Sequence, residues 1–216
     1  MKEEYSQKIA SNLLQTGAIK FNFEKPFTWT SGIKSPVYCD NRLSLSFVEV
    51  RNLIKEAYIQ VIHEHFPDTE VIAGIATGAI AQGAMVADQM GLPFVYVRSK
   101  AKGFGMDKTV EGTLQKGAKT VIIEDLISTG GSSLKAMKDL QNEGANVLGM
   151  VAILSYELPM AGKNFSENNC TLYTLSNFST VLDVALTKGY ITKEEAGKLH
   201  KWHQDPEIFF SSSCFL

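Results

Sequence analysis

The stretch Val121-Ile122-Ile123-Glu124-Asp125-Leu126-Ile127-Ser128-Thr129-Gly130-Gly131-Ser132-Ser133 decides the fold. Its apolar run, over about 120–123, predicts a buried strand, and the Ser/Thr/Gly turn predicts the start of a helix over about 132–142. Glu124 and Asp125 follow the run and are expected at the carboxyl end of the strand. Because ligands of open α/β sheets bind at these ends, the stretch is also a candidate site.

The residue types of this stretch point to a ribose phosphate. A turn that exposes backbone N–H groups and hydroxyls at a helix N-terminus suits a phosphate, and glycines let the backbone approach it closely. Two carboxylates would repel that phosphate, but they accept hydrogen bonds from a vicinal diol. A P-loop lysine and a GxGxxG pattern are both absent. A solvated acidic turn before an N-capped helix remains the alternative.

Working outward, short Val/Ile-rich runs alternate with helical patterns. The runs lie at about 70–75, 92–97, 120–123 and 146–154, and the helical patterns at 47–66, 78–90 and 132–142. This alternation predicts an α/β fold with a parallel sheet flanked by helices. The last third adds a run at 171–175 and helical patterns at 177–188 and 192–203. A helix that ends near Gly17, followed by short strands within 18–43, is expected as an N-terminal cap.

The connection between the second and third runs is the longest one in this pattern. It covers about 20 residues from Arg98 to Gly117 with little periodicity, and connections of that length are usually functional or disordered. We therefore predict residues 1–45 as an N-terminal helix and cap, and 46–216 as the core with a mobile loop at about 98–112.

Composition narrows the class of protein. The 216 residues carry a formal charge of −2, with 44% hydrophobic and 20% charged residues. Without a basic footprint, nucleic-acid and membrane-surface partners are disfavoured, and no apolar run approaches the roughly 18 residues of a membrane span. The three cysteines lack CxxC spacing. A soluble cytoplasmic protein is expected.

Three segments resemble one family. The stretch at 121–133 is similar to the phosphoribosyl pyrophosphate (PRPP) motif of type I phosphoribosyltransferases. Its particular residues are similar to those of the orotate-specific members. Residues 27–40, Phe-Thr-Trp-Thr-Ser-Gly-Ile-Lys-Ser-Pro-Val-Tyr-Cys-Asp, resemble the N-terminal hood of those members. Residues 97–105, Val-Arg-Ser-Lys-Ala-Lys-Gly-Phe-Gly, resemble their mobile catalytic loop. Similarity extends in patches over most of the chain.

The resemblance implies an enzyme that transfers the phosphoribosyl group from PRPP to orotate, yielding orotidine monophosphate and pyrophosphate in pyrimidine (UMP) biosynthesis. Catalytic roles are implied for Lys102, Arg98 and Asp125. Phe104 stands where the family often has a histidine. The implied PRPP-binding residues are Arg98, Lys102, Glu124, Asp125, Leu126, Ile127, Ser128, Thr129, Gly130, Gly131, Ser132, Thr77 and Gly78.

For orotate, the resemblance implies contacts from Lys34, Tyr38, Cys39 and Thr129. It also implies Mg²⁺ as the cofactor, held mainly by the substrate without direct protein ligands, and a homodimer whose subunits share active sites. Two alternatives remain open: a phosphoribosyltransferase for another base, and a non-catalytic PRPP-sensing regulator. Residues 27–40 favour the pyrimidine, and retention of Arg98 and Lys102 favours catalysis.

Overall fold

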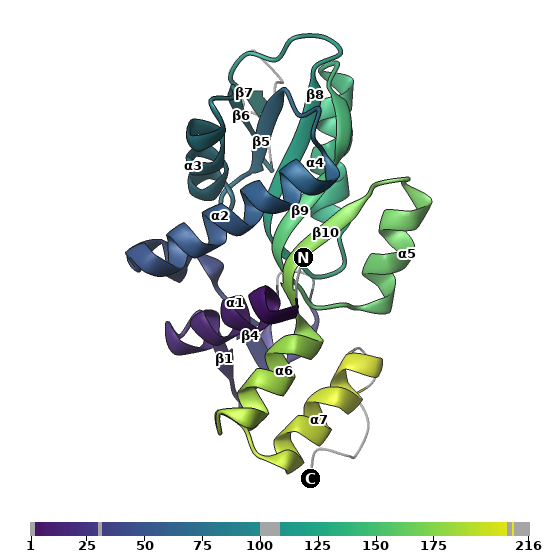
Figure 1. Cartoon of the computed structure of the whole chain (residues 1–216). Helices are drawn as coiled ribbons and strands as arrows, with labels where there is room; N and C mark the ends of the chain where they lie inside the picture. The colour runs from purple at the N-terminus through teal and green to yellow at the C-terminus, as the bar shows by residue number, and fades with distance from the viewer. Residues whose placement is uncertain (1–2, 30–31, 100–108, 207–208, 210–216) are drawn as a thin grey trace.

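The computed structural model describes residues 3–29, 32–99, 109–206 and 209. Its centre is a six-stranded sheet in the order β10-β9-β8-β5-β6-β7 (Figure 1). All neighbouring strands are parallel except the edge pair β6 and β7. The strands span Val71–Ile75 (β5), Phe94–Val97 (β6), Val110–Glu111 (β7), Lys119–Ile127 (β8), Asn146–Ser155 (β9) and Leu172–Asn177 (β10).

Helices cover both faces of the sheet, as alternating strand side chains require. On one face, Val121 and Ile123 of β8 share a hydrophobic core with α2 (Val48–His65) and α3 (Ile80–Met90). On the other face, Ile122 packs with α4 (Gly131–Asn142) and α5 (Pro159–Glu167). Between Val121 and Ile123 the odd-numbered positions of β8 therefore point toward α2 and the even-numbered one toward α4. At the end of the strand the order is reversed, because Leu126 packs against the α2 core and Ile127 belongs to the α4 core.

A second group of elements lies in the lower half of Figure 1 and packs into the same core as α2. Its helices are α1 (Glu3–Gln15), α6 (Phe178–Thr187) and α7 (Lys193–Gln204). The 3-10 helix η1 (Asn41–Ser46) also belongs to the group. Its short strands are β1 (Ile19–Phe21), β2 (Phe27–Thr28), β3 (Lys34–Ser35) and β4 (Val37–Cys39), paired as β1-β4 and β2-β3. Residues 27–40 are here called the hood; within it β2 pairs with β3, and β4 pairs with β1, which precedes the hood. The α1 helix packs against α6 and β10.

The predicted α/β fold with a mostly parallel, helix-covered sheet is confirmed, with three local differences. First, β8 continues to Ile127, because Leu126 and Ile127 pair with Leu154 and Ser155 of β9, so the two acids lie within the strand. Second, α5 was not expected; its signal is Pro159, which occupies the first turn, where no N–H partner is needed. Third, the connection after β6 contains the edge strand β7. The domain division at residue 45 stays a prediction.

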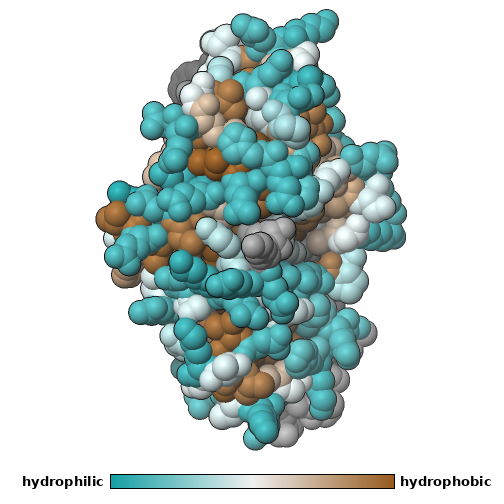
Figure 2. Space-filling view, in the orientation of Figure 1, coloured by the Kyte–Doolittle hydropathy of each residue, from teal (hydrophilic) through white to brown (hydrophobic). Residues whose placement is uncertain are grey.

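The surface is mainly polar on the face that Figure 2 shows. Hydrophilic side chains cover most of that face, and hydrophobic ones form separate patches. Within the described ranges, each helix is too short or too polar to cross a lipid bilayer.

Candidate active site

Two adjoining cavities lie where the core strands end. The hood cavity, of about 520 Å³, lies between the hood and the end of β8. The helix cavity, of about 390 Å³, extends from β8 toward α4. The residues that line both are Thr77, Gly78, Asp125, Leu126 and Ser128. Because these five come from the turn after β5 and from the β8–α4 segment, the stretch that decides the fold also forms the centre of the site.

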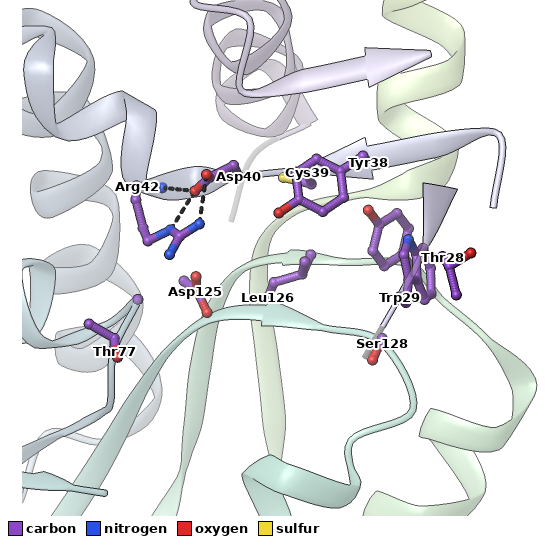
Figure 3. Close-up of a pocket in the computed structure, with 12 residues that line it drawn as sticks. Thr28, Trp29, Tyr38, Cys39, Asp40, Arg42, Thr77, Asp125, Leu126 and Ser128 are labelled. Atoms are coloured by element: carbon purple, nitrogen blue, oxygen red, sulfur yellow. Dashed lines mark hydrogen bonds and ion pairs between the residues drawn. The ribbon is translucent and has the colours of Figure 1, made fainter. Parts of the chain in front are cut away.

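Figure 3 shows how the hood cavity is built. Tyr38, Asp40 and Arg42 lie along one side, and Asp125, Leu126 and Ser128 face them from the core. Thr77 lies at the Asp125 end, and Trp29 with Thr28 lies at the other end. A flat ligand between the two sides would therefore contact hood side chains on one face and the end of β8 on the other.

The two acids of β8 have different environments, because neighbouring strand residues point to opposite faces. Glu124 is only 5% exposed, and its carboxylate accepts hydrogen bonds from Ser133 Oγ of α4 (2.8 Å) and from the Asp125 backbone N–H (2.9 Å). Asp125 is half-buried and lines both cavities. Burial, followed by the charge of Asp125, raises the pKa of Glu124 well above its usual value. Asp125 is thus the carboxylate more open to a ligand.

Gly78 lies directly against the Asp125 carboxylate. A Cβ atom on Gly78 would lie within 2.8 Å of the Asp125 Cγ and both its oxygens. The φ of Gly78 is not positive, so close approach and not backbone conformation requires a glycine. The turn after β5 and the end of β8 therefore fit together only because position 78 lacks a side chain.

The N-terminus of α4 is open toward the helix cavity. Its N-cap, Gly130, has a φ of +80°, and no side chain of the described residues caps the helix there. A Cβ on Gly130 would meet the Phe165 ring at 2.6 Å, so a glycine is needed here for both conformation and space. Ser132 lines the cavity next to these free N–H groups. Uncapped N–H groups at the positive end of a helix form an anion site.

Arg98 places a cation on the helix cavity. It follows β6 directly, and its Nη1 lies 3.3 Å from Glu111 Oε1 on the edge strand β7. Its backbone N–H donates to Thr109 O at 2.8 Å. Lys135 of α4 also lines this cavity and pairs with Asp139 at 2.7 Å. The anion site at α4 and the cation at Arg98 thus share one cavity with Thr77 and Gly78.

A bidentate ion pair follows the hood. The Arg42 Nε and Nη2 donate to the two Asp40 oxygens at 2.6 and 2.8 Å. These hydrogen bonds lower the pKa of Asp40. Because a guanidinium has five N–H donors, Arg42 retains donors for a ligand in the hood cavity. Sequence reasoning missed Arg42, although it lies only two residues beyond the segment that resembles the hood.

Two further residues fix the end of β8, and sequence reasoning did not identify either. Asn41 Nδ2 donates to the Asp125 carbonyl at 2.6 Å, and the Tyr58 hydroxyl of α2 donates to the Glu124 carbonyl. Cys39 Sγ donates in turn to Asn41 Oδ1 at 3.2 Å. Each donor lies far in the sequence from the carbonyl that it contacts, so no local pattern signals these contacts.

Several predicted site residues line the cavities and others do not. Tyr38 and Cys39 line the hood cavity, and burial raises the pKa of the Cys39 thiol, which stays protonated. Lys34 is exposed and is not among the lining residues of either cavity. Thr129 lines neither, and its carbonyl accepts from Asn164 Nδ2 at 2.8 Å. Ile127, Gly130 and Gly131 shape the turn without lining a cavity. Lys102 and Phe104 lie outside the described residues.

The described ranges contain no group of three or more His, Cys, Asp or Glu side chains placed to hold an ion. Cys39 and Cys170 are both free and buried.

The buried carboxyl of Glu124 leads to a prediction about the stability of the fold. Because the pKa of Glu124 is higher in the folded than in the unfolded chain, its protonated form favours folding. The free energy of unfolding therefore decreases as the pH rises through the folded-state pKa. Glu124→Gln retains an acceptor for the Asp125 N–H and cannot ionise. We expect it to unfold about 3 °C above the parent chain at pH 8, the shift produced by roughly 1 kcal/mol at this size, with a smaller difference at pH 5. Thermal unfolding at both pH values measures this, and a difference that grew toward low pH would contradict it.

Comparisons with known proteins agree with the fold. Residues 44–185 match the family model of the phosphoribosyl transferase domain. Orotate phosphoribosyltransferase of Porphyromonas gingivalis is 53% identical over 201 residues, covering 93% of this chain and 96% of the relative. The Streptococcus thermophilus protein of the same name is 50% identical over 204 residues, covering 94% and 98%.

Solved structures show the same architecture. Orotate phosphoribosyltransferase from Aeropyrum pernix superposes with a TM-score of 0.74 at 26% identity, over 85% of this chain and 99% of that one. Leishmania donovani UMP synthase has a TM-score of 0.79 at 24% identity, over 92% of this chain and 42% of that longer one.

The mostly parallel sheet flanked by helices is the fold of the type I phosphoribosyltransferases. The chain belongs to the orotate phosphoribosyltransferase family, whose members are pentosyltransferase enzymes.

Proposed function

We propose that the chain carries out the reaction of its family, transferring the phosphoribosyl group from PRPP to orotate and releasing pyrophosphate. The observation that carries the proposal is the pair of cavities that meet at Asp125, one under the hood and one at the N-terminus of α4. A reaction between a flat anionic base and a phosphorylated sugar needs two such half-sites with the reacting carbon between them. The names of the relatives support orotate as the base.

The ribose phosphate half-site is the β8–α4 segment. Asp125 accepts hydrogen bonds from the ribose hydroxyls, and Glu124 supports it from the helix cavity. The uncapped N-terminus of α4, with Ser128 and Ser132, holds the phosphate. The remaining predicted members, Leu126, Ile127, Thr129, Gly130 and Gly131, contribute backbone to this turn.

The pyrophosphate half-site is proposed at Thr77, Gly78 and Arg98. As the bond from ribose C1 to the pyrophosphate oxygen breaks, positive charge develops on the sugar and negative charge on the leaving group. Cations aimed at that leaving group lower the barrier. Arg98 supplies one from the rim of the helix cavity, and Lys102 is proposed to supply another. We propose that orotate attacks C1 through a ring nitrogen that has lost its proton to solvent before the step, so that no general base of the protein takes part in it.

Mg²⁺ is proposed to enter with PRPP. Of the carboxylates that line the helix cavity, Glu124 accepts from Ser133 and Asp139 pairs with Lys135, which leaves Asp125 to face a hydrated cation held mainly by substrate oxygens. The ion would supply positive charge on the pyrophosphate. Asp125 would orient the ribose hydroxyls that the ion shares.

The base half-site is the hood cavity. Tyr38 and Cys39 contribute one wall, and Trp29 contributes the aromatic end. Arg42 is the cation that lines this cavity among the described residues, and we propose that its free N–H groups bind the orotate carboxylate. The earlier candidates Lys34 and Thr129 stay predictions.

A homodimer with shared active sites, located in the cytoplasm, completes the proposal. The resemblance of 97–105 to a loop that reaches the neighbouring subunit supports the shared site. The exposed side chains of Leu43, Phe47 and Val48 follow the hood and offer apolar surface for a second copy.

One assay tests the reaction. Purified chain with Mg-PRPP should consume orotate, followed by its ultraviolet absorbance, and release one pyrophosphate per orotate. Adenine and uracil are the matched alternative substrates. Adenine tests whether the chain acts on a purine, and uracil lacks the carboxylate that is proposed to bind Arg42. If the chain turned over adenine but not orotate, adenine would replace orotate as the proposed base. PRPP binding without turnover of any base would favour a regulator.

A further inference from the structure

The hydroxyl of Tyr156 is buried without a hydrogen-bond partner at the edge of the hood cavity. Tyr156 follows β9, is 1% exposed and is one of the lining residues of that cavity. Within the described ranges, its hydroxyl forms no hydrogen bond. A buried, unsatisfied hydroxyl costs about 1–3 kcal/mol, whereas a phenylalanine would fill the same space without that cost. A tyrosine at this position is therefore explained if the bound ligand supplies the hydrogen-bond partner of its hydroxyl.

Packing fixes the ring of Tyr156 in place. The Trp29 ring, which also lines the cavity, lies 4.4 Å from it between centroids. The centroids of the Phe178 and Trp202 rings lie 6.2 and 6.3 Å away. The Tyr156 backbone N–H donates to Ile127 O at 2.9 Å. A ring held in this way cannot turn its hydroxyl to another partner at low cost.

The C-terminal helix α7 adds to this support. His203 Nε2 lies 2.7 Å from the Tyr156 carbonyl, and Trp202 Nε1 donates to the Lys34 carbonyl of the hood at 2.9 Å. One helix thus holds both the end of β9 and the hood. Position 156 is therefore set relative to the hood by contacts that lie outside residues 44–185, the part shared with phosphoribosyl transferases generally.

The protonation state of the hydroxyl defines the partner. Burial, and after it the nearby Cys39 thiol, raises the pKa of Tyr156 well above its usual value. The Cys39 backbone N–H lies near enough to oppose this, but outside hydrogen-bond geometry, and it could only donate to the hydroxyl oxygen, so the hydroxyl proton still has no acceptor. The group stays protonated at neutral pH and acts as a donor. Its partner must offer an acceptor oxygen, and orotate presents two ring carbonyls and a carboxylate.

We propose that Tyr156 is a specificity-determining residue of the base site, whose hydroxyl donates a hydrogen bond to an oxygen of the bound pyrimidine. The inference rests on the proposed function, because it assigns one contact within the same hood cavity. It adds a neutral donor at the β9 end of that cavity to the guanidinium of Arg42 at the other end.

Tyr156→Phe tests the assignment because it removes only the hydroxyl. We expect the KM for orotate to rise about tenfold, the effect of one hydrogen bond to an anion, while the KM for PRPP stays within about twofold. The midpoint of thermal unfolding should stay the same or increase. Tyr173→Phe is the matched control, since that half-buried tyrosine lies on β10 against His65 and Phe66.

The outcomes separate the two proposals. An unchanged KM for orotate in Tyr156→Phe would overturn the inference alone. A lower unfolding midpoint with equal changes in both KM values would also overturn it, because it would show a structural role. A parent chain that turned over no orotate would overturn the proposed function and this inference with it.

Discussion

Gly78→Ala is expected to lower kcat/KM by more than about a hundredfold. The added methyl would lie within 2.8 Å of the Asp125 Cγ and both its oxygens, closer than carbon atoms approach such groups without displacement. Either the Asp125 carboxylate or the turn after β5 must move, and both line the two cavities. A shift of about 1 Å among positioned groups can alone cost about a hundredfold in rate. Steady-state kinetics with orotate and Mg-PRPP measures the loss.

Gly162→Ala is the control for this substitution. Gly162 lies within α5, and a Cβ there has no neighbour within 4 Å among the described residues. Alanine should stabilise that helix by up to about 1 kcal/mol and leave the kinetics unchanged. If Gly78→Ala retained the activity of the parent chain, the close contact between position 78 and Asp125 would not exist in solution.

Asp125→Asn is expected to weaken PRPP binding about thirtyfold while the fold is retained. The substitution keeps the size of the side chain but removes the charge, and hydrogen bonds to charged groups contribute about 1.5–3 kcal/mol. Burial, and after it the charge of Asp125, raises the pKa values of Glu124, Tyr58 and Cys39, so the ionised forms of these buried groups are not stabilised by that charge. Calorimetric titration with Mg-PRPP measures affinity, and thermal unfolding measures stability.

Asp68→Asn provides the matched loss of one negative charge. Asp68 is exposed and pairs with Lys119 at the start of β8, at the opposite end of that strand from the site. Surface pairs of this kind contribute about 0–1 kcal/mol, so PRPP affinity should not change. Equal affinities in Asp125→Asn and Asp68→Asn would remove Asp125 from the ribose site.

The sequence predicted the centre of the site because that part is local. Strand, acids, turn and helix start follow one another within thirteen residues, and each has a known preference for residue type. The face on which each acid lies was not predicted, since the strand was expected to end before Glu124. Its continuation to Ile127 depends on pairing with Leu154 and Ser155 of β9, which lie elsewhere in the chain.

The base side of the site was harder to predict because it is assembled from distant segments. Asn41 contacts a carbonyl 84 positions away, and Tyr58 contacts one 66 positions away. Arg42 carried no motif, and the identity of Tyr156 gave no sign that its hydroxyl would be buried next to the hood. Burial and long-range pairing arise only from the tertiary packing, so residue type alone does not reveal them.

The hydrogen bond from Trp202 to Lys34 spans 168 positions, and this separation has a consequence for synthesis on the ribosome. A growing chain can form β8, α4 and their turn as soon as the neighbouring strands have emerged. The hood gains its support from α7 only after residues 193–204 have been translated. Contacts of such long separation form late because closing the intervening chain costs entropy. A nascent chain should thus acquire the proposed ribose phosphate half-site before the hood cavity.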